Sequence, residues 1–113
     1  MRPKQADIIF QLLETPKAFR FKSDLSLQIL LLISSNGGLC DLKLLAKISV
    51  TPMALRQHVK MLEAEDWVKL EINEASRRNK LISLTNKATR KLEEYNRNIE
   101  RLFLDYVGIM HSE

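Results

Sequence analysis

Several residue types that stabilise small proteins or supply reactive groups are scarce in this 113-residue chain. Cys40 is the only cysteine, which excludes an intrachain disulfide and a cysteine metal cluster and fits a reducing cytoplasm. Only three glycines and three prolines are present, so long irregular loops are not expected and helices should predominate. No signal peptide is recognisable, and no apolar run is long enough to cross a bilayer.

The groups that enzymes use are equally sparse. We find no Ser/His/Asp set, no paired-acid motif and no glycine-rich phosphate loop, and His58 and His111 are far apart in the sequence. The sequence therefore predicts no catalytic residue, no metal site and no cofactor. Cys40 is expected to be a small buried hydrophobic residue, with redox sensing as the less favoured alternative.

Positive charge is concentrated in the middle of the chain. The net charge is +4, but residues 41–91 contain eleven Lys and Arg against six Asp and Glu, whereas residues 92–113 contain two against five. Such a field would attract a polyanion to the central segment. The acidic C-terminal segment is expected to have a different role.

Apolar spacing divides the first part of the chain into short helices. Residues 5–14 show a helical stripe that Thr15-Pro16 should end, because proline disfavours helical geometry in the residue before it. A second helix should occupy residues 24–35, and Asn36-Gly37-Gly38 should stop it. Residues 39–40 are predicted to form a strand stub.

A helix-turn-helix pattern follows: a helix of about eight residues capped by Asp41, a turn at residues 49–50, and a second helix over residues 52–65. Apolar positions 55, 59 and 62 fix the inward face of the second helix. Arg and Gln on the opposite face are suited to guanine and adenine edges in the major groove. A solvated helix face is the alternative. The residues of this helix predicted to bind DNA are Thr51, Met53, Arg56, Gln57 and Lys60.

The sequence period changes from helical to alternating after Trp67. Apolar and polar residues alternate over residues 68–73 and 82–85, which predicts a hairpin with one apolar face. The hairpin tip carries Arg77, Arg78 and Lys80, which would contact phosphates or a narrow minor groove. A solvated turn would show the same composition. The tip therefore indicates DNA binding only in combination with the helix pair before it.

Together these segments resemble winged helix-turn-helix transcription regulators, most closely the MarR type, with PadR-type regulators next. The resemblance begins at Ser26 and is strongest over residues 51–63 and 77–85. It implies that residues 51–65 form the recognition helix, that the arginines of the tip belong to the wing, and that a homodimer binds an operator, often under control of a small ligand or of oxidation. The sequence departs from this family's pattern at three positions that usually hold glycine: Ser49, Asp66 and Ala88.

The last part of the chain, from about Asn86 to His111, should form one long helix. Its apolar residues recur alternately four and three positions apart, a spacing typical of a coiled-coil seam. Such a helix would be about 38 Å long, more than a small domain can cover, so we predict dimerisation, with the 5–14 helix as a second contributor. Packing on its own domain is the alternative. The predicted dimer contacts are Leu92, Tyr95, Ile99, Leu102, Phe103, Tyr106 and Ile109.

The sequence thus predicts a mainly α fold with a small β-hairpin: a winged helix-turn-helix over residues 24–85, preceded by a helix and link (1–23) and followed by a dimerisation helix (86–113). The predicted function is sequence-specific binding of double-stranded DNA at a pseudo-palindromic site by a homodimeric, cytoplasmic transcription regulator, most simply a repressor. No membrane partner is expected, and a small-molecule effector has no support among the residues. Two alternatives remain: a winged-helix protein-interaction module, and an architectural or replication-associated DNA-binding protein. An enzyme is the least favoured.

Overall fold

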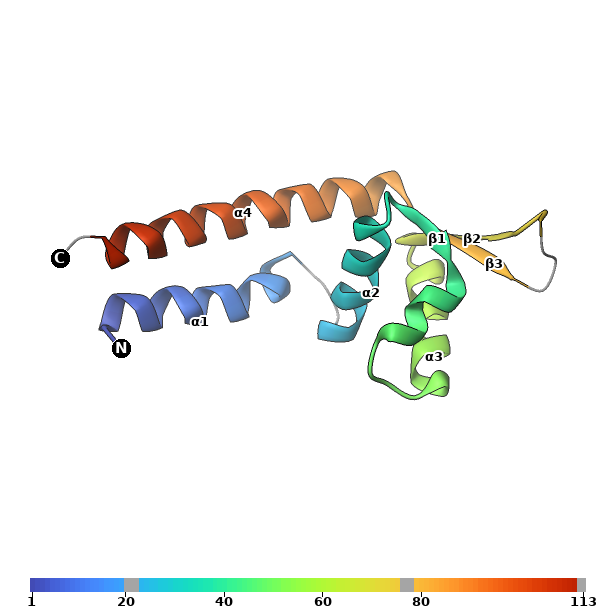
Figure 1. Cartoon of the computed structure of the whole chain (residues 1–113), viewed down its shortest axis with the longest axis horizontal. Helices are drawn as coiled ribbons and strands as arrows, with labels where there is room; N and C mark the ends of the chain where they lie inside the picture. Colours follow the sequence, from blue (N-terminus) through green and yellow to red (C-terminus); the bar gives the residue numbers. More distant parts are fainter. Residues whose placement is uncertain (20–22, 76–78, 112–113) are drawn as a thin grey trace.

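Two helices from opposite ends of the chain lie side by side and form an arm that projects from a small head (Figure 1). The arm consists of α1 (Pro3–Ala18) and α4 (Asn86–Met110), which run in opposite directions, and the head comprises residues 24–84. In this computed structural model the described residues are 1–19, 23–75 and 79–111, and the longest dimension is 58 Å. The arm accounts for most of that length, as Figure 1 shows.

The head combines three short helical segments with a three-stranded antiparallel sheet of order β1-β3-β2. Strands β2 and β3 form the hairpin that we call the wing, and β1 pairs with the other side of β3, so that Cys40 and Leu70 flank Ile82. The predicted strand stub is therefore a true edge strand of the sheet. The elements of the head are α2 (Asp24–Ser35), β1 (Leu39–Asp41), the 3₁₀ helix η1 (Leu42–Lys47), α3 (Pro52–Ala64), β2 (Val68–Ile72) and β3 (Lys80–Leu84).

Hydroxyl side chains cap three of the helices. Ser23, Thr51 and Thr85 each accept a hydrogen bond of 3.1–3.2 Å from the main-chain N–H three residues further on, which satisfies one of the free donors of each helix. Gly37 and Gly38, with φ of 83° and 87°, end α2 in the left-handed geometry that glycine adopts without strain.

The helix predicted after Asp41 is shorter and more tightly wound than expected. Asp41 caps it as predicted, because its carboxylate accepts a 2.8 Å hydrogen bond from the N–H of Lys43. However, the helix is a six-residue 3₁₀ helix, and Ile48 is already extended, with ψ of 129°. The extended residue leads the chain directly into the turn before α3.

The core of the head joins the helices to the sheet and to the start of the arm. Its fully buried centre is formed by Ile29, Leu30 and Ile33 of α2, with Leu45 and Ile82. Further buried members come from α3, from Trp67 just before the wing, from β2 and from the first two turns of α4: Val59, Leu62, Trp67, Val68, Ala88 and Leu92. The start of α4 is therefore packed into the hydrophobic core of the head.

The predicted end of the first helix at Thr15-Pro16 is wrong, because α1 continues through Pro16 to Ala18. Thr15 is buried, and its hydroxyl donates a 2.6 Å hydrogen bond to the carbonyl of Gln11 and accepts one of 3.3 Å from the Asn98 amide of α4. A proline inside a helix removes one main-chain hydrogen bond. Packing along α4 and the polar contact at Thr15 compensate for that loss.

None of the helices in the described ranges is both long and apolar enough to cross a membrane.

Candidate nucleic-acid interface

Helix α3 presents the outward face that the sequence predicts. Val59 and Leu62 are buried, whereas Arg56, Gln57 and Lys60 are exposed and Met53 exposes 70% of its surface. The hydroxyl of Thr51 accepts the capping hydrogen bond from the N–H of Ala54, so this side chain fixes the start of the helix. The face is therefore free to enter a groove that is wide enough for a helix.

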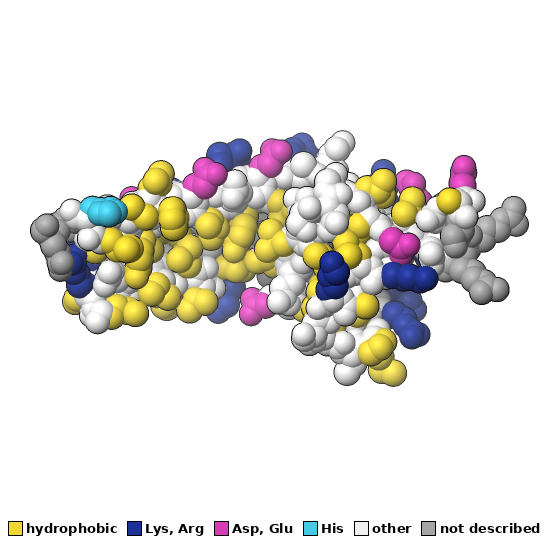
Figure 2. Space-filling view, in the orientation of Figure 1, with side chains coloured by type: hydrophobic (Ala, Val, Ile, Leu, Met, Phe, Trp, Pro, Cys, Tyr) yellow, Lys and Arg dark blue, Asp and Glu magenta, His cyan; other side chains and the backbone are white. Residues whose placement is uncertain are grey.

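Cations from several elements surround this face. The exposed ones that line the groove beside α3 are Lys43 of η1, Arg56 and Lys60 of α3 and Lys80 of β3. Within the part of the chain that the structure describes, none of them forms a salt bridge, so their charges are not neutralised locally. Figure 2 shows basic side chains gathered at the end of the molecule opposite the free end of the arm. The predicted wing residues Arg77 and Arg78 lie outside the described residues.

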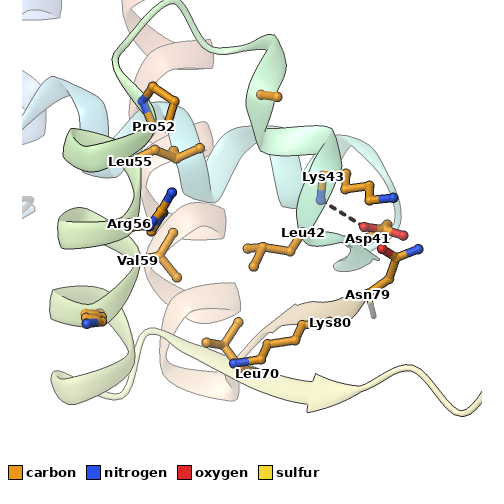
Figure 3. A pocket seen from close by; sticks show the side chains of 12 residues that line it. Asp41, Leu42, Lys43, Pro52, Leu55, Arg56, Val59, Leu70, Asn79 and Lys80 are labelled. Atoms are coloured by element: carbon orange, nitrogen blue, oxygen red, sulfur yellow. Dashed lines mark hydrogen bonds between the residues drawn. The ribbon is translucent and has the colours of Figure 1, made fainter. Parts of the chain in front are cut away.

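A groove of about 610 Å³ connects α3 to the wing. Figure 3 shows Leu55 and Val59 projecting from α3 toward η1 and the hairpin, with Lys80 across the groove. The amide oxygen of Asn79, at the wing side, is buried and has no hydrogen-bond partner among the described atoms. Cations of three elements thus border one concave surface, which is the arrangement that a continuous phosphate-binding stripe requires. The lining residues are Asp41, Leu42, Lys43, Ala46, Pro52, Leu55, Arg56, Val59, Lys60, Leu70, Asn79 and Lys80.

The arm carries a second surface, which is apolar. Phe10 and Leu13 of α1 and Phe103, Leu104 and Met110 of α4 are each more than half exposed. Figure 2 shows hydrophobic side chains covering the arm along its length. Exposed apolar area of this kind marks an interaction surface on a soluble protein.

The seven residues predicted for dimerisation differ in how far they are exposed in the structure. Leu92 and Leu102 retain only 7% and 3% exposure because they pack inside their own chain. Tyr95 packs edge-on against Phe19, with ring centroids 6.0 Å apart. Phe103 is exposed, and three residues are half-buried: Ile99, Tyr106 and Ile109.

The heptad spacing found the face of α4 that meets a neighbouring helix, but it could not identify that neighbour. Part of the face is covered by α1 of the same chain, with Ile8 and Leu102 buried in the arm. Phe10, Leu13 and Leu104 were not predicted to be exposed. Leu13 belongs to the predicted stripe of residues 5–14, and Phe10 and Leu104 are apolar residues beside the predicted stripes.

Two side chains near these surfaces have shifted pKa values. Burial, and to a smaller extent the carboxylate of Asp41, raises the pKa of the Cys40 thiol, so the thiol stays protonated at neutral pH. Burial and the carboxylate of Asp24 likewise raise the pKa of Tyr95. Over the described ranges, no cluster of three His, Cys, Asp or Glu side chains could hold a metal ion.

Known proteins share this fold. Residues 22–69 match the family model described as winged helix-turn-helix DNA-binding. No curated protein matches the sequence. Among solved structures, YusO from Bacillus subtilis superposes with a TM-score of 0.77 and 19% identity, covering 95% of this chain and 75% of YusO.

Two further structures show the same architecture. A cysteine-to-serine mutant of MarR from E. coli, complexed with operator DNA, superposes with a TM-score of 0.70 and 18% identity over 91% of this chain and 74% of MarR. The transcriptional regulator Tm0710 from Thermotoga maritima gives a TM-score of 0.70 and 23% identity, covering 96% of this chain and 78% of that protein.

The chain has the winged helix-turn-helix fold, and the exposed face of α3 lies where that fold carries its second helix. Its architecture is that of the MarR-type transcription regulators.

Proposed function

We propose that this protein is a homodimeric transcription regulator that binds a pseudo-palindromic site in double-stranded DNA and represses transcription by occupying that site in the cytoplasm. The observation that carries the proposal is the exposed outer face of α3, bordered by unneutralised cations of η1, α3 and β3 around one groove. Side chains of this face would contact base edges, and the surrounding cations would contact phosphates.

Each predicted DNA contact has a distinct role in this proposal. Arg56 and Gln57 are suited to guanine and adenine, and Lys60 extends the same face by one turn. Lys80, from the wing, supplies a phosphate contact beside the groove, and the wing residues Arg77 and Arg78 are proposed as further phosphate or minor-groove contacts. Thr51 orients the start of the helix.

Dimerisation through the arm is proposed from its exposed apolar face. A twofold dimer presents the same surface of both copies to each other. It would place two recognition helices about one DNA turn, roughly 34 Å, apart, so the site would contain two inverted half-sites. A repressor needs no further activity, because its occupancy of the site prevents other proteins from binding there.

The test is selection of bound duplexes from a random-sequence library, followed by titration of the selected site across salt. We expect an enriched motif of two inverted half-sites and an affinity whose logarithm falls with the logarithm of salt at about −0.9 per neutralised phosphate. If no sequence is enriched and binding disappears at moderate salt, only generic electrostatic attraction remains. The protein-interaction alternative would then replace this proposal.

A further inference from the structure

Two neighbouring hydrophobic side chains stand exposed at the start of α3. Met53, in the first turn of the helix, exposes 70% of its surface, and Val50, in the preceding turn, exposes 38%. Leaving large apolar side chains in water forgoes the stabilisation that burial would provide. Their position at the tip of the proposed recognition helix points to a role in binding.

The apolar face of the arm does not account for this pair. That face is formed by α1 and α4, whereas the start of α3 lies on the far side of the head from α4 (Figure 1). Met53 instead shares the outward face of α3 with Gln57, one helical turn further on, and both side chains are exposed. If this face of α3 enters the major groove, Met53 and Gln57 therefore enter it together.

Only one of the four DNA bases offers an apolar group in the major groove, the 5-methyl group of thymine. Methionine is unbranched and polarisable, so it can adapt its shape to such a small apolar target. We propose that Met53 recognises a thymine methyl group in each half-site and is a specificity-determining residue of this protein. This inference rests on the proposed DNA-binding function.

The geometry also locates the thymine relative to a second base. Met53 and Gln57 are four residues apart, which is about 6 Å along the helix at 1.5 Å per residue. Base pairs are stacked about 3.4 Å apart, so the thymine contacted by Met53 lies within about two base pairs of the adenine contacted by Gln57.

The test replaces single thymines of the selected site by uracil, which removes the methyl group and leaves the hydrogen-bonding groups unchanged. Affinity is measured for the wild-type protein and for three variants. Met53→Leu retains an apolar side chain, Met53→Ala removes it, and Lys60→Ala is the matched control on the same face. Both positions are exposed, so the variants should retain the fold, and circular dichroism checks this.

At one thymine per half-site, we expect uracil to weaken wild-type binding about fourfold, the effect of losing contact with one methyl-sized group. Met53→Leu should keep most of this ratio and Met53→Ala should abolish it, whereas Lys60→Ala should weaken both sites equally. The inference is overturned if the protein selects a site but Met53→Ala abolishes the effect of uracil at none of its thymines. DNA binding itself would remain intact in that case. Failure to select any site overturns the proposed function and this inference with it.

Discussion

The hydroxyl of Thr85 donates a 2.7 Å hydrogen bond to the main-chain carbonyl of Asp66. Asp66 lies in the turn that ends α3, and Thr85 is the N-cap of α4, where the same hydroxyl accepts from the N–H of Ala88. Lys87, the second residue of α4, donates a 2.7 Å hydrogen bond to the carbonyl of Glu65. The proposed recognition helix is thereby held directly by the first turn of the arm.

Thr85→Ala should lower the free energy of unfolding by about 2 kcal/mol, because it removes a helix cap and leaves the carbonyl of Asp66 without its donor. Thr85→Ser keeps the hydroxyl and should lose less than about half of that value. Urea unfolding monitored by circular dichroism measures both. Equal losses in the two variants would show that the methyl group, and not the hydroxyl, stabilises this junction.

Asp66 is the only described residue other than glycine with a positive φ, 63°. The left-handed conformation strains a side chain with a Cβ and leaves glycine unstrained. Asp66 is exposed, so Asp66→Gly should be more stable than Asp66→Ala by about 1 kcal/mol, the reverse of their order in a helix. Thermal unfolding of the two variants provides the comparison. The prediction fails if the alanine variant is the more stable one.

Phe103→Glu should convert the proposed dimer to a monomer, because it places a charge on the exposed apolar face of the arm. Since Phe103 is 61% exposed, the isolated fold should lose little stability. Ile72→Glu is the matched control, because Ile72 is 69% exposed but lies on the wing. Sedimentation equilibrium distinguishes the outcomes: equal effects of the two substitutions, or a wild-type monomer, would remove the arm from the proposed interface.

Cys40 should react slowly with thiol reagents in the folded protein. Its raised pKa keeps the thiol protonated at pH 7, and the thiolate is the reactive form. Its side chain is also buried on β1. The reaction with Ellman's reagent should accelerate at least about tenfold in denaturant, where the thiol regains an ordinary pKa and full access. A fast reaction in the native state would revive redox sensing as a mode of regulation.

The sequence predicted the elements whose signals are local. Ser23 and Thr51 cap helices where the pattern places the caps, the glycines after α2 adopt left-handed geometry, and the alternation after Trp67 corresponds to the wing. Asp66 was recognised as an unusual residue at a glycine position, and its positive φ gives the physical reason for the family's preference.

The sequence failed where contacts between distant segments decide the structure. Pro16 does not end α1, because packing on α4 and the contact between Thr15 and Asn98 hold the helix together. The apolar period of α4 could not show that Leu92 joins the core of the head or that Leu102 is covered by α1. Both outcomes depend on which surfaces meet in space, and a one-dimensional pattern does not contain that information.

The most direct test of sequence-specific DNA binding by α3 is the affinity of wild-type protein and Arg56→Ala for the selected site and for random duplex of equal length. Arg56 is exposed on α3 and borders the groove between that helix and the wing. We expect Arg56→Ala to lose about 1–3 kcal/mol on the selected site and little on random DNA, because a base contact discriminates and a phosphate contact does not. Equal losses on both duplexes would contradict the assignment of α3 as the helix that recognises bases.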